Sequence, residues 1–138
     1  MSRHNWIRLK WAFAGMAAYF LTMPVSAQYF ELKDPILEQN GIKYAITGVA
    51  ESKDDARWKT APLIVEFATQ RAELYADVDV KIQDASQKQI FAVKVNAPWL
   101  VLWLQPGTYT VHATDKNGVS KSMTVNVTTA HQMKTFKW

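Results

Sequence analysis

The amino-acid sequence predicts an all-β protein, a single antiparallel Greek-key β-sandwich of about seven strands with one short helix. Apolar and polar residues alternate in several short segments, most clearly in 78–82 and 109–114, and this period of two is typical of half-buried strands. Turn signals separate the segments, among them Pro106-Gly107 and Asn117-Gly118, the second suited to a type I′ hairpin turn. Short strands at close spacing are typical of a sandwich, in which Greek-key connections are usual. An up-and-down barrel is the alternative architecture.

The centre of the domain is an apolar strand at 98–104, followed by a turn and a second strand. Pro106 fixes its own φ for the turn, and Gly107 is expected to take the positive φ that other residues resist. In the second strand, Tyr109 falls on the core face and His112 on the opposite, polar face.

The apolar strand has two apolar faces, although a sandwich buries only one face of each strand between its sheets. We assign one face to the core and the other outward; the core face comprises Leu100, Leu102 and Leu104, and the outward face Trp99, Val101 and Trp103. One interpretation is that the predicted helix, through Trp58, or the N-terminal arm covers the outward face. Leaving such side chains in water forgoes about 1.5–3 kcal/mol each. The other interpretation is an exposed aromatic patch that binds a partner.

Residues 1–27 are expected to be a secretory signal peptide. A basic start (Arg3, Arg8, Lys10) precedes the apolar run 11–23, and small residues lead to a cleavage point after Ala27. The run is shorter than the roughly 20 apolar residues of a membrane span, and an uncleaved membrane anchor is the alternative. Cleavage leaves 111 residues, enough for one domain. We expect this domain to be soluble in the bacterial periplasm or secreted, without stable membrane insertion.

Charge and cysteine content exclude several classes of partner and stabilisation. Three of the 16 basic residues and none of the 12 acidic residues lie in the leader, which leaves 13 against 12 and a net charge of +1. The exported chain therefore has no clustered basic surface that would predict nucleic-acid binding. Because the chain has no cysteine, it forms no disulfide, although the compartment would permit one.

The segment before the sandwich is expected to contain a mobile arm at 28–40, which ends at the turn signal Asn40-Gly41. The sandwich domain is predicted to span 41–138. Its short helix is predicted at 52–59, where Ser52 can cap the first turn. The acidic pair Asp54-Asp55 fits the helix start better than a metal site, because the helix dipole favours acids there.

No recognisable set of catalytic residues is found, and we expect no metal and no cofactor. His112 and His131 are the only histidines after the leader, and zinc requires three or four ligands. The nucleophile elbow, the phosphate loop and the His-Glu-x-x-His motif are all missing from the sequence. Asp77 and Asp79 share one strand face and are candidate calcium ligands, but Lys81 continues that face and favours a solvated strand with cross-strand ion pairs.

The ordered motifs from Gly41 to the end of the chain resemble the carboxypeptidase regulatory-like domains, which are transthyretin-like Greek-key sandwiches. The resemblance is closer to a group of small proteobacterial exported proteins of uncharacterised function. The motifs that carry it are Gly-Ile-x-Tyr at 41–44, Ala-Asp-Val-x-Val at 76–80, Pro-Trp-Leu at 98–100, Leu-x-Pro-Gly-x-Tyr at 104–109 and the final Trp138.

The resemblance implies a non-catalytic accessory or binding domain, with Pro106, Gly107 and Tyr109 forming a structural turn and corner. In a tyrosine corner the Tyr109 hydroxyl would bond back to a backbone group. The hydroxyisourate hydrolases of this fold end in Tyr-Arg-Gly-Ser, whereas this chain ends in Thr-Phe-Lys-Trp, so that activity is not expected. Two hypotheses remain: a protein-interaction or structural module of the cell envelope, and a carbohydrate-binding module that uses the Trp99, Val101 and Trp103 face. The expected partner is therefore an envelope protein or a glycan.

Overall fold

The computed structural model describes residues 33–70 and 77–138, and Asp34–Trp138 forms one compact unit. The predicted signal peptide and the first residues of the predicted arm lie outside the described residues.

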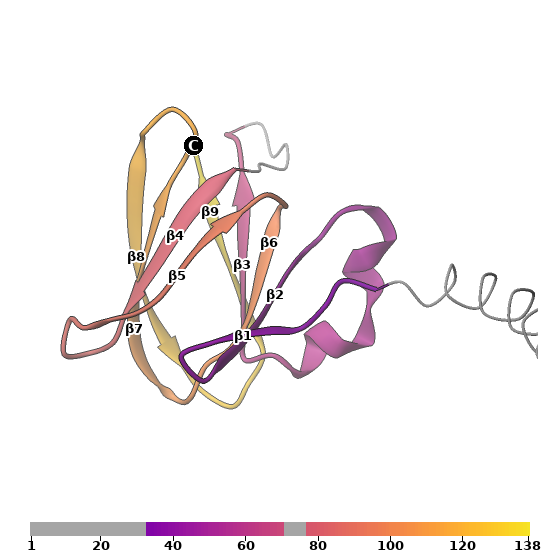
Figure 1. The fold of residues 1–138 in the computed structure, drawn as a ribbon, viewed down its shortest axis with the longest axis horizontal. Helices are drawn as coiled ribbons and strands as arrows, with labels where there is room; N and C mark the ends of the chain where they lie inside the picture. Colours follow the sequence, from indigo (N-terminus) through magenta and orange to yellow (C-terminus); the bar gives the residue numbers. More distant parts are fainter. Residues whose placement is uncertain (1–32, 71–76) are drawn as a thin grey trace, which may run out of the picture. The chain divides into compact units, whose positions relative to one another are not determined.

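The strands form two sheets packed face to face, which confirms the predicted all-β sandwich (Figure 1). The five-stranded sheet has the order β1-β2-β6-β3-β9, built from β1 (Leu37–Gln39), β2 (Ile42–Thr47), β6 (Trp99–Trp103), β3 (Leu63–Ala68) and β9 (Gln132–Lys137). The four-stranded sheet has the order β5-β4-β7-β8, built from β5 (Gln89–Val95), β4 (Val78–Gln83), β7 (Gly107–Thr114) and β8 (Ser120–Val127).

Strand number and direction differ from the prediction in two details. The described residues contain nine strands rather than about seven, and one of them, β1, lies in the segment predicted as a mobile arm. One pair, β3 with β9, is parallel, whereas the other pairs are antiparallel. β9 follows β8 in the chain, and β8 belongs to the other sheet. β9 therefore reaches β3 by a connection between the sheets and not by a hairpin, which would make the pair antiparallel.

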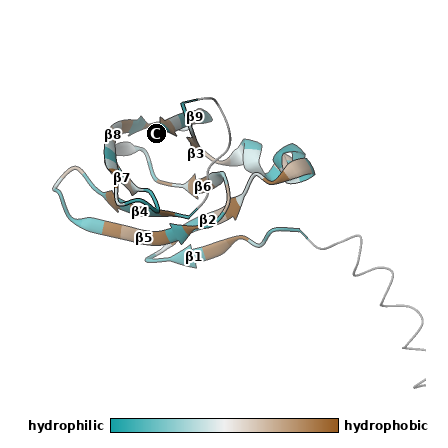
Figure 2. Ribbon diagram, turned by 90° about the horizontal axis from the view of Figure 1, so that it is seen from above, coloured by the Kyte–Doolittle hydropathy of each residue, from teal (hydrophilic) through white to brown (hydrophobic). Residues whose placement is uncertain are grey.

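The main core lies between the two sheets, where Leu100 and Leu102 are fully buried and Leu104 nearly so. The leucine face of β6 therefore points into the sandwich, as predicted. Figure 2, coloured by hydropathy, shows the two layers from above, with the helical segment on the side of the five-stranded sheet.

The connection at Pro106-Gly107 crosses from one sheet to the other, because β6 and β7 belong to different sheets. The positive φ predicted for Gly107 is wrong: the described glycines with positive φ are Gly41, Gly48 and Gly118. Gly107 is simply the first residue of β7. A crossover between sheets needs no left-handed residue, unlike a two-residue hairpin.

The two Asn-Gly sequences form different turns. At Asn40-Gly41 both residues have positive φ, 50° and 76°, as a type I′ turn requires. The β7–β8 hairpin forms as predicted, but there only Gly118 is left-handed, so its turn is not type I′. Its loop is instead organised by Asp115, whose Oδ1 accepts hydrogen bonds from the backbone N–H groups of Asn117 and Val119.

The predicted helix at 52–59 is replaced by two short 3₁₀ helices, η1 (Ala50–Asp54) and η2 (Ala56–Thr60). Asp55 is extended, with φ −64° and ψ 121°, and its side chain accepts from the backbone N–H of Arg57. Asp55, which was expected inside the first turn of one helix, instead separates the two helices and caps η2. A short polar side chain stabilises a helix more as an N-cap than as an interior residue. Within residues 33–70 and 77–138, no helix has the length and apolar character needed to span a membrane.

Candidate functional site

The tryptophan face of β6 is covered and offers no exposed aromatic patch. Trp99 is 9% exposed, Val101 is 0% exposed and Trp103 is half-buried. They form a second apolar cluster with Trp58, which is 2% exposed and lies on η2. The interpretation in which the helical segment covers this face through Trp58 is therefore correct, and the exposed binding patch is not present.

Specific contacts hold the two helical turns of this cover together and against the sheet. Trp58 Nε1 donates to the Ser52 carbonyl at 2.8 Å, and its ring centre lies 6.1 Å from that of Trp103. On the outer side, the Arg57 guanidinium lies 4.5 Å from the Trp58 ring centre, within the range of a cation–π contact. Hydrogen bonding to Asp55 raises the pKa of Arg57 above its ordinary value.

The indoles of β6 also have partners. Trp99 Nε1 donates to Glu66 Oε2 at 2.8 Å, and Trp103 Nε1 donates to Thr60 Oγ1 at 3.1 Å. In the described part of the chain, no buried side-chain nitrogen or oxygen lacks a hydrogen-bond partner. The outer face of the five-stranded sheet therefore has the structure of a second core.

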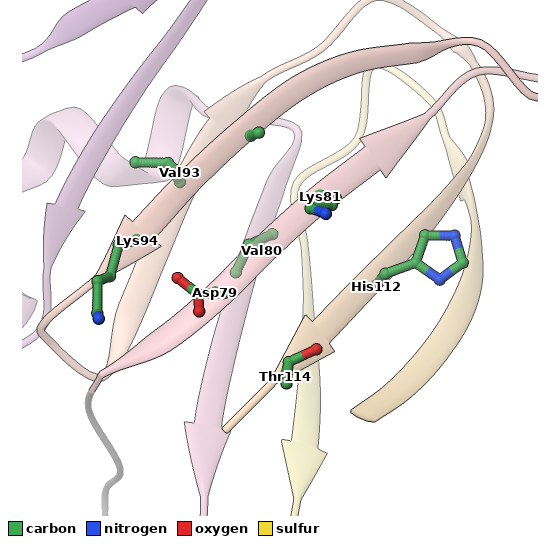
Figure 3. A pocket seen from close by; sticks show the side chains of 8 residues that line it. Asp79, Val80, Lys81, Val93, Lys94, His112 and Thr114 are labelled. Carbon is green, nitrogen blue, oxygen red and sulfur yellow. The ribbon is translucent and has the colours of Figure 1, made fainter. Parts of the chain in front are cut away.

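The outer face of the four-stranded sheet has the opposite character, and we call it the polar sheet face. It consists of the outward side chains of β4, β5, β7 and β8: Asp79, Lys81, Gln83, Ala92, Lys94, Thr110, His112, Thr114, Ser120, Ser122 and Thr124. A shallow hollow of about 520 Å³ lies across β5, β4 and β7 on this face. Figure 3 shows Asp79 between Lys94 and Thr114, in the order of their strands. Ala92 is the smallest side chain of the lining.

Hydrogen bonds hold several side chains of the polar sheet face in place. His112 Nδ1 lies 2.6 Å from Ser122 Oγ, and Nε2 lies 3.2 Å from Gln83 Oε1. Which group donates in each of these two contacts depends on the tautomer of the His112 ring. Thr114 Oγ1 on β7 lies 2.7 Å from Ser120 Oγ on the neighbouring strand β8.

The charged groups of the polar sheet face do not form the cross-strand ion pairs that the sequence predicted. Among the described residues, no ion pair joins Asp79 to Lys81 or Lys94. The same part of the chain contains no group of three His, Asp or Glu side chains arranged to hold a metal ion. Among the described residues, the two acids proposed as calcium ligands, Asp77 and Asp79, therefore have no third partner.

Tyr109 and His131 both contact backbone carbonyls. The Tyr109 hydroxyl donates to the Gln105 carbonyl at 2.8 Å across the crossover, which is the geometry of a tyrosine corner. Burial raises the pKa of Tyr109, and the negative charge of Asp84 adds to this shift. His131 Nδ1 lies 2.6 Å from the Ala61 carbonyl, just before β9 of the five-stranded sheet. His112 lies on β7 of the other sheet.

The sequence identified some members of the polar sheet face on β4 and β7, but not the face as a unit. Alternation placed Asp79, Lys81 and His112 on wet faces, whereas the register that brings Lys81 opposite both Ala92 and His112 is visible only in the structure. No family model matches the chain, and no curated protein matches it. The resemblance to carboxypeptidase regulatory-like domains stays a prediction from the sequence motifs.

Proposed function

We propose that this protein is an exported, non-catalytic β-sandwich module that binds a protein partner in the cell envelope through the polar sheet face. The observation that carries the proposal is the difference between the two outer faces. The outer face of the five-stranded sheet is covered by the helical segment through Trp58, whereas the polar sheet face is open and has a hollow of about 520 Å³. The resemblance to regulatory-like domains supports the same class of function.

The chemistry of the polar sheet face favours recognition over catalysis. Ser122 and His112 are in contact, but the third position is occupied by the Gln83 amide. In a Ser-His-Asp triad a carboxylate at that position stabilises the imidazolium that forms during the reaction, and an amide carries no charge to do so. Short hydroxyl side chains held by mutual hydrogen bonds instead present fixed donors and acceptors to a partner, at low cost in side-chain entropy.

A protein partner fits this face better than a glycan does. Sugars are bound by stacking on exposed aromatic rings, and the polar sheet face carries none among its described residues. Charges of both signs, from Asp79, Lys81 and Lys94, suit the mixed charges of a protein surface, and in the described part of the chain these three groups form no ion pair with one another.

Site-specific photo-crosslinking tests the proposal. A photoreactive residue at Thr114, within the hollow, is expected to capture a defined envelope protein in living cells. The matched control places the same residue at Lys59, an exposed position on the opposite side of the sandwich, and is expected to capture none. Equal capture from both positions, or capture from Lys59 alone, would show that the polar sheet face is not the binding surface.

Carbohydrate binding is a second candidate, at a different place from the one the sequence suggested. Half-buried Trp138 stacks on Phe136, with ring centres 6.0 Å apart. It lines a hollow of about 430 Å³ together with the polar residues Asp115, Asn117 and Lys121. A glycan array probed with the wild-type protein and with Trp138→Ala decides this candidate. A glycan signal that is lost in the variant supports it, and an array without signal ends it.

A further inference from the structure

The described residues form two sheets with four edge strands, and three of these carry a recognised protection against pairing with another chain. β1 is only three residues long, and short edge strands offer few backbone groups. β8 and β9 each place a lysine on the face that points into the sandwich, Lys121 opposite core residue Ala113 and Lys134 opposite core residue Val65. An inward-pointing charge at an edge prevents further strands from adding, because pairing would bury it.

β5 is the edge strand that has neither protection. It is seven residues long, and Phe91, Val93 and Val95 face the core without any charge among them. Residues 90–93 read Ile-Phe-Ala-Val, which appears as the brown part of β5 in Figure 2. Such a segment of high β-propensity and low charge is prone to pair with a copy of itself when its edge is open.

Two side chains of the β1–β2 turn occupy the backbone groups along this edge. Gln39 Nε2 donates to the Ala92 carbonyl at 2.9 Å, and Gln39 Oε1 accepts from the Ala92 N–H at 2.8 Å. One carboxamide thus satisfies both backbone groups of one residue, as a residue of a paired strand does. Asn40 Nδ2 donates to the Ile90 carbonyl at 3.1 Å, two residues further along the same edge.

The local backbone places these two amides. Asn40 and Gly41 form the tight type I′ turn, so Gln39 is the last residue of β1 and Asn40 lies at the tip of the hairpin. The hairpin belongs to the five-stranded sheet, whereas β5 belongs to the other. The amides therefore reach across one open side of the sandwich.

We propose that Gln39 and Asn40 close the edge of β5 against pairing with the β5 edge of a second copy of this chain. Two β5 edges brought together in antiparallel order offer each other the same outward groups, at Ile90 and Ala92, that the two amides now hold. The amides do for β5 what Lys121 and Lys134 do for β8 and β9. The polar sheet face then remains the surface through which the protein meets a partner.

The test removes both amides and keeps the turn. The double variant Gln39→Ala/Asn40→Gly is compared with the wild-type protein by sedimentation velocity over a range of concentrations and by hydrogen exchange of the β5 amides. We expect the dissociation constant for self-association to fall by at least about tenfold, with faster exchange at Ala92 in the monomer. The single variant Gln39→Ala, which keeps Asn40, is measured in parallel and decides the question if the double variant does not fold.

Two further variants identify the edge that is used. Gln132→Ala removes a side-chain hydrogen bond to the Asn126 carbonyl on β8, where Lys121 remains, and is expected to stay monomeric. Adding Val93→Lys to the double variant gives β5 an inward charge and is expected to restore the monomer. A double variant that exchanges rapidly at Ala92 yet stays monomeric would overturn the proposal. Association that Val93→Lys does not reverse would also overturn it.

Discussion

Gly48 lies directly against the ring of Trp99. A Cβ atom at Gly48 would lie 2.7 Å from Trp99 Cγ and 2.9 Å from Trp99 Cβ, closer than side-chain atoms approach in folded proteins. Gly48 also has a φ of +98°, which residues with a Cβ rarely adopt. The end of β2 therefore approaches the second core at a place where only glycine fits.

We expect Gly48→Ala to lower the free energy of unfolding by about 2–4 kcal/mol, since backbone strain and overpacking add at this position. Gly41→Ala is the matched control. Gly41 also has a positive φ, but a Cβ atom added there would meet nothing within 4 Å, so only the strain of about 1 kcal/mol applies. Urea unfolding of both variants checks the difference. Equal losses would show that Gly48 is not constrained by Trp99.

Trp58 is expected to be the residue on which the helical cover depends. Trp58→Ala should lower the free energy of unfolding by about 3–5 kcal/mol, as for other buried aromatic truncations, because the ring is 2% exposed and packs against the β6 cluster. Trp103→Ala should cost less, about 1–3 kcal/mol, because Trp103 is half-buried. Chemical denaturation gives both values, and a larger loss for Trp103 would contradict the covering arrangement.

Tyr109→Phe removes the hydrogen bond to the Gln105 carbonyl and is expected to lower the free energy of unfolding by about 0.5–1.5 kcal/mol. The effect should also depend on pH. The folded-state pKa of Tyr109 is raised by burial, so its contribution is complete below the unfolded value of about 10 and is lost as pH rises through the folded pKa. Melting curves from neutral to alkaline pH should show the wild type losing its advantage over Tyr109→Phe. A constant difference across that range would contradict the buried, protonated hydroxyl.

The exported protein is expected to begin at Gln28, after the small residues Val25-Ser26-Ala27. Intact mass of the protein from the periplasmic fraction or the culture medium checks this position. A protein of full-length mass that stays with the membrane fraction would support the uncleaved anchor instead.

Local patterns in the sequence were sufficient for most of the strands and for the direction of their faces. The alternation in 78–82 and 109–114 identified β4 and β7. The core face of β6 was predicted from the family resemblance, which implies a core leucine at the position of Leu104. The same patterns carry no information about pairing across the molecule. The parallel β3–β9 pair, the crossing at Gly107 and the contact between Gln39 and Ala92 all depend on residues far apart in the chain.

The covered face of β6 and the N-terminal segment show the same division. The composition of β6 predicted two apolar faces and left open whether the outward face is covered through Trp58 or exposed. The expected single helix is instead two 3₁₀ helices, because Asp55 caps the second one and does not continue the first. The residues 34–40, expected to belong to a mobile arm, instead join the sandwich through β1. That segment is short and has no alternating pattern that would predict a strand. Its structure depends on pairing with β2 and on side-chain hydrogen bonds to β5.

Filling the hollow on the polar sheet face tests the central claim most directly. Ala92→Tyr places a large side chain at the smallest residue of the lining, opposite Lys81, and tyrosine is well suited to a strand. The control Lys59→Tyr adds the same ring at an exposed position on the opposite side of the sandwich. The measurement is the amount of the envelope partner, identified by crosslinking at Thr114, that is retained by each immobilised variant. We expect Ala92→Tyr to reduce retention by at least about tenfold and Lys59→Tyr to leave it unchanged, with both variants melting near the wild-type temperature. Undiminished retention by a folded Ala92→Tyr protein would contradict the assignment of the polar sheet face as the binding surface.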